Sequence, residues 1–165
     1  MKINIEMENH YVVEAHRNGE LLWVDEYDNI VVDVGCNDVL DKYFKGSTYT
    51  AAHYVGLIAE SPTIVAGDTM ASHSGWTEVT AYSEGARQTL TMGTVAAKSA
   101  SNTLSKAVFT INSDSTVVAG AFVATNSTKG GTTGTLYGAG TFTAPRTLQS
   151  GDTLSVTVTA TAAAA

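Results

Sequence analysis

Two histidines and two carboxylates in the middle of the chain are residue types that bind zinc. They are His53, Asp68, His73 and Glu78. Structural zinc sites place their four ligands at short, regular spacings, and the spacings here match no such motif. His53 alternates with apolar residues, which is typical of a packed strand histidine. The sequence therefore predicts no metal site and no cofactor.

A glycine-rich segment, residues 130–134, is the kind of loop that can hold a phosphate group. A P-loop ends in Lys followed by Ser or Thr and leads into a helix, whereas this segment leads into a strand-like run. We therefore interpret it as a flexible hairpin loop. The sequon at residues 126–128 has no meaning without a secretory signal, and residues 1–10 lack the charged and apolar regions of one.

The residues of nucleophilic and acid–base catalysis are present without the patterns that use them. No serine lies in a glycine-flanked nucleophile turn, and Glu78 and Glu84 lack a second carboxylate at a telling spacing. Cys36 is the single cysteine, so no internal disulfide can form, and no histidine partner pattern accompanies it. We expect Cys36 to be a small buried or half-buried residue. The sequence predicts a protein without enzymatic activity.

The charge of the chain is low and unevenly placed. Charged residues make up 15% of the 165 residues, against about 25% in average soluble domains. Residues 1–60 contain eleven Asp or Glu and four Lys or Arg, a net charge of −7, and residues 61–165 contain five of each. An acidic chain does not bind nucleic acid through phosphates. The acidic third is either a solvated face or a surface for a basic protein partner.

No apolar run reaches the about 18 residues that a transmembrane helix needs. The sequence therefore predicts no membrane partner and synthesis in the cytoplasm.

The carboxyl-terminal part reads as a series of strands separated by glycine-rich turns. Residues 153–161 alternate strictly between apolar residues and hydroxyl residues, which predicts a half-buried strand in an antiparallel sheet. We expect residues 94–101, which are small and polar, to form a loop. The predicted fold is an all-β antiparallel sandwich or jelly roll. Its interior is expected to contain Phe109, Ile111, Phe122, Leu154, Val156 and Val158.

The first 34 residues predict a small meander with a hairpin. Asn18-Gly19 between two β-rich runs is a strong signal for a type I′ turn. Residues 30–34 are expected to form a third strand beside the hairpin. A two-residue loop predicts three cross-strand pairs, namely Arg17 with Glu20, Val13 with Val24 and Glu14 with Trp23.

One short helix follows the meander. Asn37 is a suitable N-cap, and Gly46 is a suitable residue to follow the last turn. The apolar residues between them fall on one helical face, which we expect to close one end of the β core. They are Val39, Leu40, Tyr43 and Phe44.

Two units are expected along the chain. Residues 1–47 would form an N-terminal arm, hairpin and helix that face a partner, and residues 48–165 would form the sandwich. Residues 1–10 alternate like a strand, and they either gain order on a partner or complete a sheet of their own chain. The candidate partner-binding residues are Ile3, Ile5, Met7, Tyr11, Trp23 and Tyr27.

Four segments resemble small structural proteins from the virion modules of tailed bacteriophages. The resemblance spans roughly residues 29–158 and rests on a pattern of segments without a mechanistic motif. These segments are Asn29–Gly35 with Asp38–Gly46, Tyr54–Leu57, Ala66–Glu78 with Tyr82 and Arg87, and Gly120–Leu136 with Phe142, Arg146 and Gly151–Leu154.

Size, strand content and low charge make the chain most similar to capsid decoration, or cement, proteins. That resemblance implies a β-sandwich on the capsid surface that bridges subunits of the major capsid protein, as a dimer or trimer, with no catalytic residues. One alternative is a head–tail, tail accessory or fibre-attachment protein. Another is a carbohydrate- or surface-binding β-sandwich that uses exposed aromatic residues. A sandwich fold alone does not separate these functions.

Overall fold

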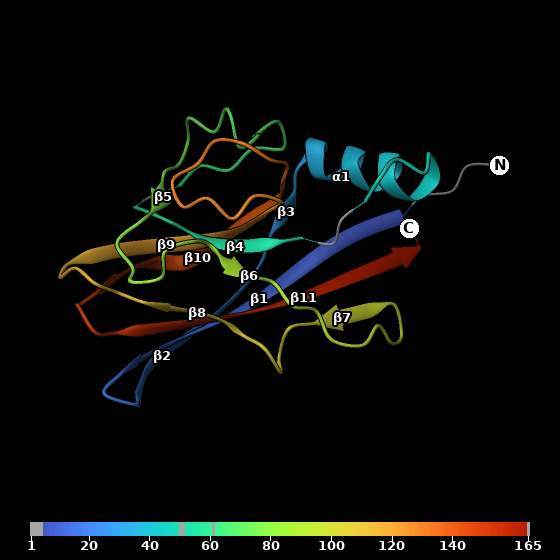
Figure 1. The fold of residues 1–165 in the computed structure, drawn as a ribbon. Helices are drawn as coiled ribbons and strands as arrows, with labels where there is room; N and C mark the ends of the chain where they lie inside the picture. The colour runs from blue at the N-terminus through green and yellow to red at the C-terminus, as the bar shows by residue number, and fades with distance from the viewer. Residues whose placement is uncertain (1–4, 50–51, 61, 165) are drawn as a thin grey trace.

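The computed structural model describes residues 5–49, 52–60 and 62–164, which form two facing antiparallel sheets (Figure 1). This confirms the predicted all-β sandwich with an N-terminal hairpin and one short helical segment. Sheet A contains β1 (Ile5–Arg17), β2 (Glu20–Asp28), β7 (Ser99–Ser101), β8 (Ala107–Thr110) and β11 (Thr153–Ala164). Sheet B contains β3 (Ile30–Val31), β4 (Tyr54–Ile58), β5 (Glu78–Val79), β6 (Gln88–Thr89), β9 (Thr116–Ala124) and β10 (Leu136–Leu148).

Strand β11 is the centre of sheet A. It pairs with β1 along one edge, from Ile5 opposite Ala164 to His16 opposite Thr153. Its other edge is shared by β8 and β7, one after the other. Between these two strands the buried side chain of Asn102 donates to the carbonyl of Val156 and accepts from the amide of Val158. The amide side chain thus supplies the hydrogen bonds that a continuous strand would make.

The interior between the sheets confirms most of the predicted core. Leu154, Val156 and Val158 are at most 1% exposed, and they cluster with Phe109 and Ile111. The strict alternation of residues 153–161 therefore gave the correct face, because a slip of one residue would have turned the hydroxyl side inward.

Phe122 is buried on the other face of sheet B, which corrects its assignment to this core. It belongs to a second cluster beneath a layer of helix and loops, with Trp76 and Met70 among its neighbours. Figure 1 shows this third layer, formed by α1 and the segment before β5, above the sheet. Strand β9 is buried on both faces, so its apolar residues do not alternate.

The predicted turn at Asn18-Gly19 is confirmed, since both residues have positive φ angles, 52° and 82°. Arg17 pairs with Glu20 as predicted. The next two pairs are wrong by one residue, because a bulge between Ala15 and His16 shifts the register. Val13 lies opposite Asp25, and Glu14 lies opposite Val24.

The helical segment begins earlier than predicted. Helix α1 (Asp33–Val39) has Val32 as its N-cap, and a π-helical turn, η1 (Leu40–Phe44), continues it. Gly35 packs against β10 so closely that a Cβ would lie 2.3 Å from the Tyr137 carbonyl oxygen. This contact fixes the helix start, which a capping pattern at Asn37 does not reveal. Gly46 follows the last turn with a φ of 77°, as expected.

The expected apolar helix face does not close the core. Leu40, Tyr43 and Phe44 are all exposed, and Tyr43 is 81% exposed. Cys36 is also exposed rather than buried. The helix instead contacts the sandwich through Gly35 and Val32, so its aromatic end points away from the interior.

Two other segments differ from expectation. Strand β3 pairs with β10 of sheet B and not with the hairpin, so the first 34 residues contribute to both sheets. Residues 99–101, expected to lie in a loop, form β7 because β11 offers a free edge at residues 159–161. Residues 5–10 complete sheet A through β11, the second of the two alternatives given for them.

Candidate functional site

A pocket lies at the end of the sandwich where the two sheets separate beneath α1 and η1. Its volume is about 420 Å³, in the range of ligand and anchor-residue pockets. Sheet A contributes Asn9, Val158 and Ala160, and sheet B contributes Val123 and Tyr137. The remaining walls come from the helix and from loops: Asp38, Val39, Lys42, Tyr43, Tyr49, His53, Leu90 and Met92.

The floor of this pocket is apolar and its few polar groups are neutral or near the rim. Burial lowers the pKa of His53 below the usual histidine value, so the ring is uncharged at neutral pH. Burial also raises the pKa of Tyr137 to about 12. Asn9 is 2% exposed, and its Nδ2 has no hydrogen-bond partner among the described residues. A buried donor without an acceptor is costly and favours a ligand that supplies one.

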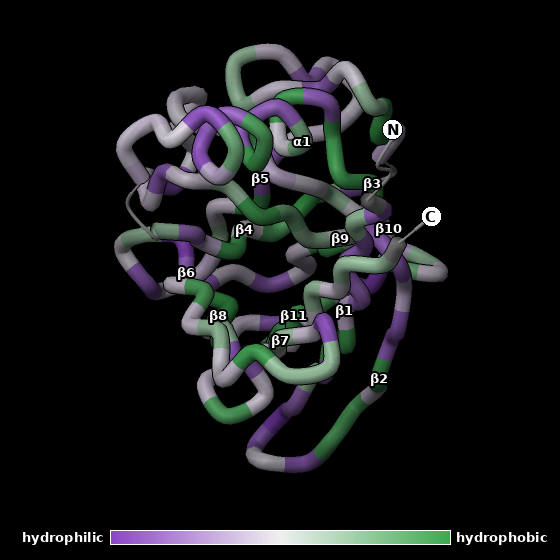
Figure 2. The backbone as a smooth tube through the Cα atoms, turned by 90° about the vertical axis from the view of Figure 1, so that its right-hand side faces the viewer, coloured by the Kyte–Doolittle hydropathy of each residue, from purple (hydrophilic) through white to green (hydrophobic). Residues whose placement is uncertain are grey.

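The β1–β2 hairpin projects from the opposite end of the sandwich (Figure 2). Its turn end is held by Arg17, the residue before the turn, whose Nε and Nη2 donate to the two oxygens of Asp152 at 2.7 and 2.8 Å. Asp25 of β2 accepts from the Thr143 hydroxyl at 2.7 Å and pairs with Arg146 at 3.3 Å. These contacts fix the hairpin to β10 and to the turn before β11, so its turn end is held rigidly against the sandwich.

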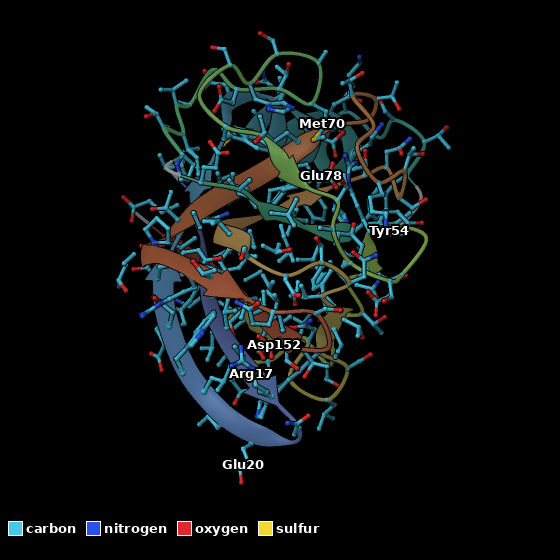
Figure 3. All side chains as sticks on the ribbon, turned by 90° about the vertical axis from the view of Figure 1, so that its left-hand side faces the viewer. Arg17, Glu20, Tyr54, Met70, Glu78 and Asp152 are labelled. Atoms are coloured by element: carbon cyan, nitrogen blue, oxygen red, sulfur yellow. The ribbon has the colours of Figure 1, made fainter. Side chains whose placement is uncertain are left out.

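The tip of the hairpin carries apolar side chains in solvent. Leu21, Leu22 and Val24 are 55%, 43% and 43% exposed. Figure 2 shows green, hydrophobic stretches on β2, and Figure 3 shows Glu20 at the tip, pointing away from the molecule. The bulge before His16 breaks the alternation here and turns both leucines outward.

The outer face of the hairpin is acidic. Glu6, Glu8, Glu26 and Asp28 are exposed. His10 is the basic group among them, with its ring nitrogens 2.8 Å from Asp28 and 3.7 Å from Glu26. Strand β2 is also an edge strand of sheet A, and edge strands can pair with a strand of another chain.

The six predicted partner-binding residues do not form one surface. Tyr11 and Tyr27 are buried and stack with ring centroids 5.0 Å apart, so they are core residues and not contact residues. Trp23 is half-buried between Phe142 and Arg146. Met7 is half-buried, with its sulfur 3.9 Å from the Tyr137 hydroxyl. Ile3 and the side chain of Ile5 lie outside the described residues.

The exposed apolar residues of the hairpin are Leu21, Leu22 and Val24, which lie next to the predicted residue Trp23 in the sequence. The predicted register, which pairs Glu14 with Trp23 and Val13 with Val24, places Trp23 outward and Val24 inward. Sequence reasoning therefore missed Leu21, Leu22 and Val24 as exposed residues. The outward position of these residues depends on the bulge, and the residue types in the sequence do not predict that bulge.

The four candidate metal ligands have other roles. His73 stacks on Trp76, and Asp68 accepts from the Trp76 indole at 3.0 Å. Glu78 pairs with Arg87, and His53 lines the pocket. Among the described residues, no three metal-ligating side chains gather.

The glycine-rich loop at residues 130–134 is held by a buried ion pair. Arg87 has no exposed side-chain surface and donates to both oxygens of Glu78, at 2.9 and 2.7 Å. It also donates to the carbonyls of Asn126 and Gly131, while the Gly130 amide donates to Glu78. The loop thus holds its conformation through Arg87 and Glu78, which supports a structural role.

A family model for the podophage GP4 fiber I protein gp80 matches residues 31–163. The chain belongs to this family. It is therefore a structural protein of the phage virion, as the resemblance in the sequence implied. The match leaves out the β1–β2 hairpin. No curated protein and no solved structure matches the chain, and no described helix of this family member is long and apolar enough to cross a membrane.

The clamp between Arg17 and Asp152 at the turn end of the hairpin makes the stability of this fibre-family protein depend on acid pH. Hydrogen bonds from Arg17 hold the pKa of Asp152 below its usual value. The contribution is therefore complete above about pH 4 and is lost as pH falls through the lower pKa of the folded state. We expect Asp152→Asn to reduce the difference in the free energy of unfolding between about pH 7 and about pH 3, measured by urea denaturation. Arg17→Met should reduce it too, and an unchanged difference in Asp152→Asn would contradict this account.

Proposed function

We propose that the protein is a non-enzymatic component of a phage fibre that works through protein–protein contact surfaces. The observation that carries the proposal is the family match over residues 31–163, because the family model describes a fibre protein. The geometry supports it, since the sites found on the described residues are an apolar pocket, an apolar hairpin tip and an acidic face. Surfaces of this kind bind proteins without performing a reaction.

Capsid decoration is the second candidate. It is supported by the segment resemblance and by a compact sandwich whose sheet A leaves one face uncovered. In this role the protein would bridge major capsid protein subunits at the capsid surface and stabilise the shell, because a ligand that binds only the assembled form shifts the equilibrium away from disassembly. Residues 1–47 would carry the partner-facing surface in either role, while β1, β2 and β3 within them complete the two sheets formed with residues 48–165.

The position in the particle separates the two candidates. Gold-labelled antibody against the protein, applied to purified virions and viewed by electron microscopy, should decorate fibres in the first role. Labelling spread over the head would instead support capsid decoration and reject the fibre role. Separate labelling of isolated heads and tails gives the same discrimination without depending on image quality.

The acidic face predicts a basic partner in the virion. We expect attachment of the purified protein to particles that lack it to weaken as salt rises, because screening reduces attraction between exposed charges. The double variant Glu26→Lys, Asp28→Lys should bind more weakly than the wild type at low salt and should lose the salt dependence. Co-sedimentation with particles measures both.

The matched control is Glu60→Lys, an exposed acid that follows β4 of the other sheet. It changes the net charge in the same direction and should leave attachment close to that of the wild type. Equal weakening by both variants would mean that net charge matters and that the hairpin face is not the contact.

A further inference from the structure

The tip of the hairpin carries three exposed apolar residues of sheet A, Leu21, Leu22 and Val24. Leu21 and Leu22 lie beside each other just after the turn of the hairpin, whose first strand is paired with β11 as far as His16, and Val24 extends the patch along β2. A cluster of exposed aliphatic side chains on a rigid element is typical of a protein contact.

The pocket at the other end has the complementary chemistry. Its apolar floor accepts aliphatic side chains, and Asn9 offers a buried Nδ2 that lacks an acceptor among the described residues. A hairpin turn carries backbone carbonyl groups beside its side chains, so a tip that enters the pocket can supply both. Burial lowers the pKa of His53, so its neutral ring places no charge against an aliphatic side chain in the pocket.

The tip cannot fill the pocket of its own chain. Asn9 and Arg17 lie on the same strand, β1, and eight residues of extended chain separate them. At the usual rise per residue this is about 27 Å. The clamp between Arg17 and Asp152 keeps the hairpin from folding back. The occupant must therefore come from another molecule.

We infer that the hairpin tip of one copy inserts into the pocket of a second copy, head to tail. Charge favours this pairing over contact between two tips, which would bring Glu20 against Glu20. Glu20 is exposed and has no ion-pair partner among the described residues, and Lys42 lies at the pocket rim, 3.7 Å from Asp41. Asp38 also lies at the rim and would weaken the attraction between Glu20 and Lys42. The apolar contact therefore provides the binding free energy, and the pair of Glu20 with Lys42 orients the two copies.

A head-to-tail contact uses two different surfaces of the chain. Each bound copy then presents a free tip at one end and a free pocket at the other, so the assembly grows as an open filament unless its rotation closes a ring. This differs from the dimer or trimer expected from the resemblance. The inference concerns the isolated protein and does not depend on its position in the virion.

The test is sedimentation velocity of the full chain over a range of concentrations. The wild type should form a series of species whose mean mass rises with concentration. Leu22→Asp at the tip should raise the dissociation constant more than about tenfold, because it places an unpaired charge in an apolar pocket. Leu104→Asp is the matched control at a leucine that is 99% exposed outside the tip, and it should associate like the wild type.

The pocket is blocked from the other side by Ala160→Trp, which fills it from β11. Ala163→Trp on the opposite face of the same strand is the control, since Ala163 is exposed and does not line the pocket. Tyr43→Ala removes a wall from an exposed position, so it tests the pocket even if Ala160→Trp does not fold.

Mixing the two blocked variants gives the decisive result. Leu22→Asp retains a pocket and Ala160→Trp retains a tip, so each alone should be monomeric and the mixture should form a one-to-one dimer that grows no further. A wild type that stays monomeric at every concentration would overturn the inference. A closed oligomer of fixed size that Leu22→Asp does not affect would overturn it as well.

Discussion

Replacing Arg87 by methionine is expected to lower the free energy of unfolding by about 3–5 kcal/mol. The substitution keeps the length of the side chain but removes the charge that faces Glu78, which is itself 7% exposed. It also leaves the carbonyls of Asn126 and Gly131 without their donor. Urea denaturation followed by circular dichroism measures the change.

Two further variants show that the buried pair is the cause. Lys106→Met removes a partly exposed pair with Glu14 and should cost at most about 1 kcal/mol. In the double variant Arg87→Met, Glu78→Leu, no charge remains buried, so it should be more stable than Arg87→Met alone. A cost for Arg87→Met as small as that of Lys106→Met would contradict the role given to the pair.

Replacing Val156 by aspartate is expected to prevent folding. Val156 has no exposed surface and lies between Leu154 and Val158 on the inner side of β11. A carboxylate there would be buried without a counterion, at a cost comparable to the total stability of a domain. Val156→Ala, which only leaves a cavity, should cost about 1–2 kcal/mol. Soluble expression and thermal denaturation distinguish the two outcomes.

Thr159→Asp is the control on the same strand. Thr159 is half-exposed on the outer face and lies opposite His10, so a carboxylate there remains solvated. We expect a change within about 0.5 kcal/mol. If Thr159→Asp were as damaging as Val156→Asp, the effect would arise from strand propensity and not from burial.

The correct parts of the sequence prediction rest on local or strictly periodic signals. Asn18-Gly19 specifies its turn because both residues accept positive φ angles. The period of two in residues 153–161 specifies which face of β11 is buried. Both signals survive in the fold because no distant contact opposes them.

The wrong parts depend on distant contacts. The helix begins at Asp33 because Gly35 must approach the backbone of Tyr137, a contact across about a hundred residues that no capping pattern reports. The side chain of Phe122 points into the second cluster because β9 is covered on both faces. An apolar strand without alternation does not say which of its two faces meets which layer.

The candidate site was the least predictable feature. The pocket combines residues from both sheets, the helix and two loops, so no segment contains its signal. The hairpin itself was predicted, but its outward residues were not, because one bulge moved Leu22 outward and left Trp23 against Phe142. A bulge is a property of the pairing and not of the residues.

The pairing of β1 with β11 has a consequence for how the chain folds during synthesis. His16 meets Thr153 and Ile5 meets Ala164, so β1 gains its second neighbour only after the ribosome has reached β11, at residues 153–164. Until then β1 and β2 form a two-stranded hairpin that is marginally stable in water and exposes a long strand edge. The acid excess of this region, with Glu6, Glu8 and Glu14 on β1, then repels other nascent copies. These charges thus protect the unfinished protein from aggregation.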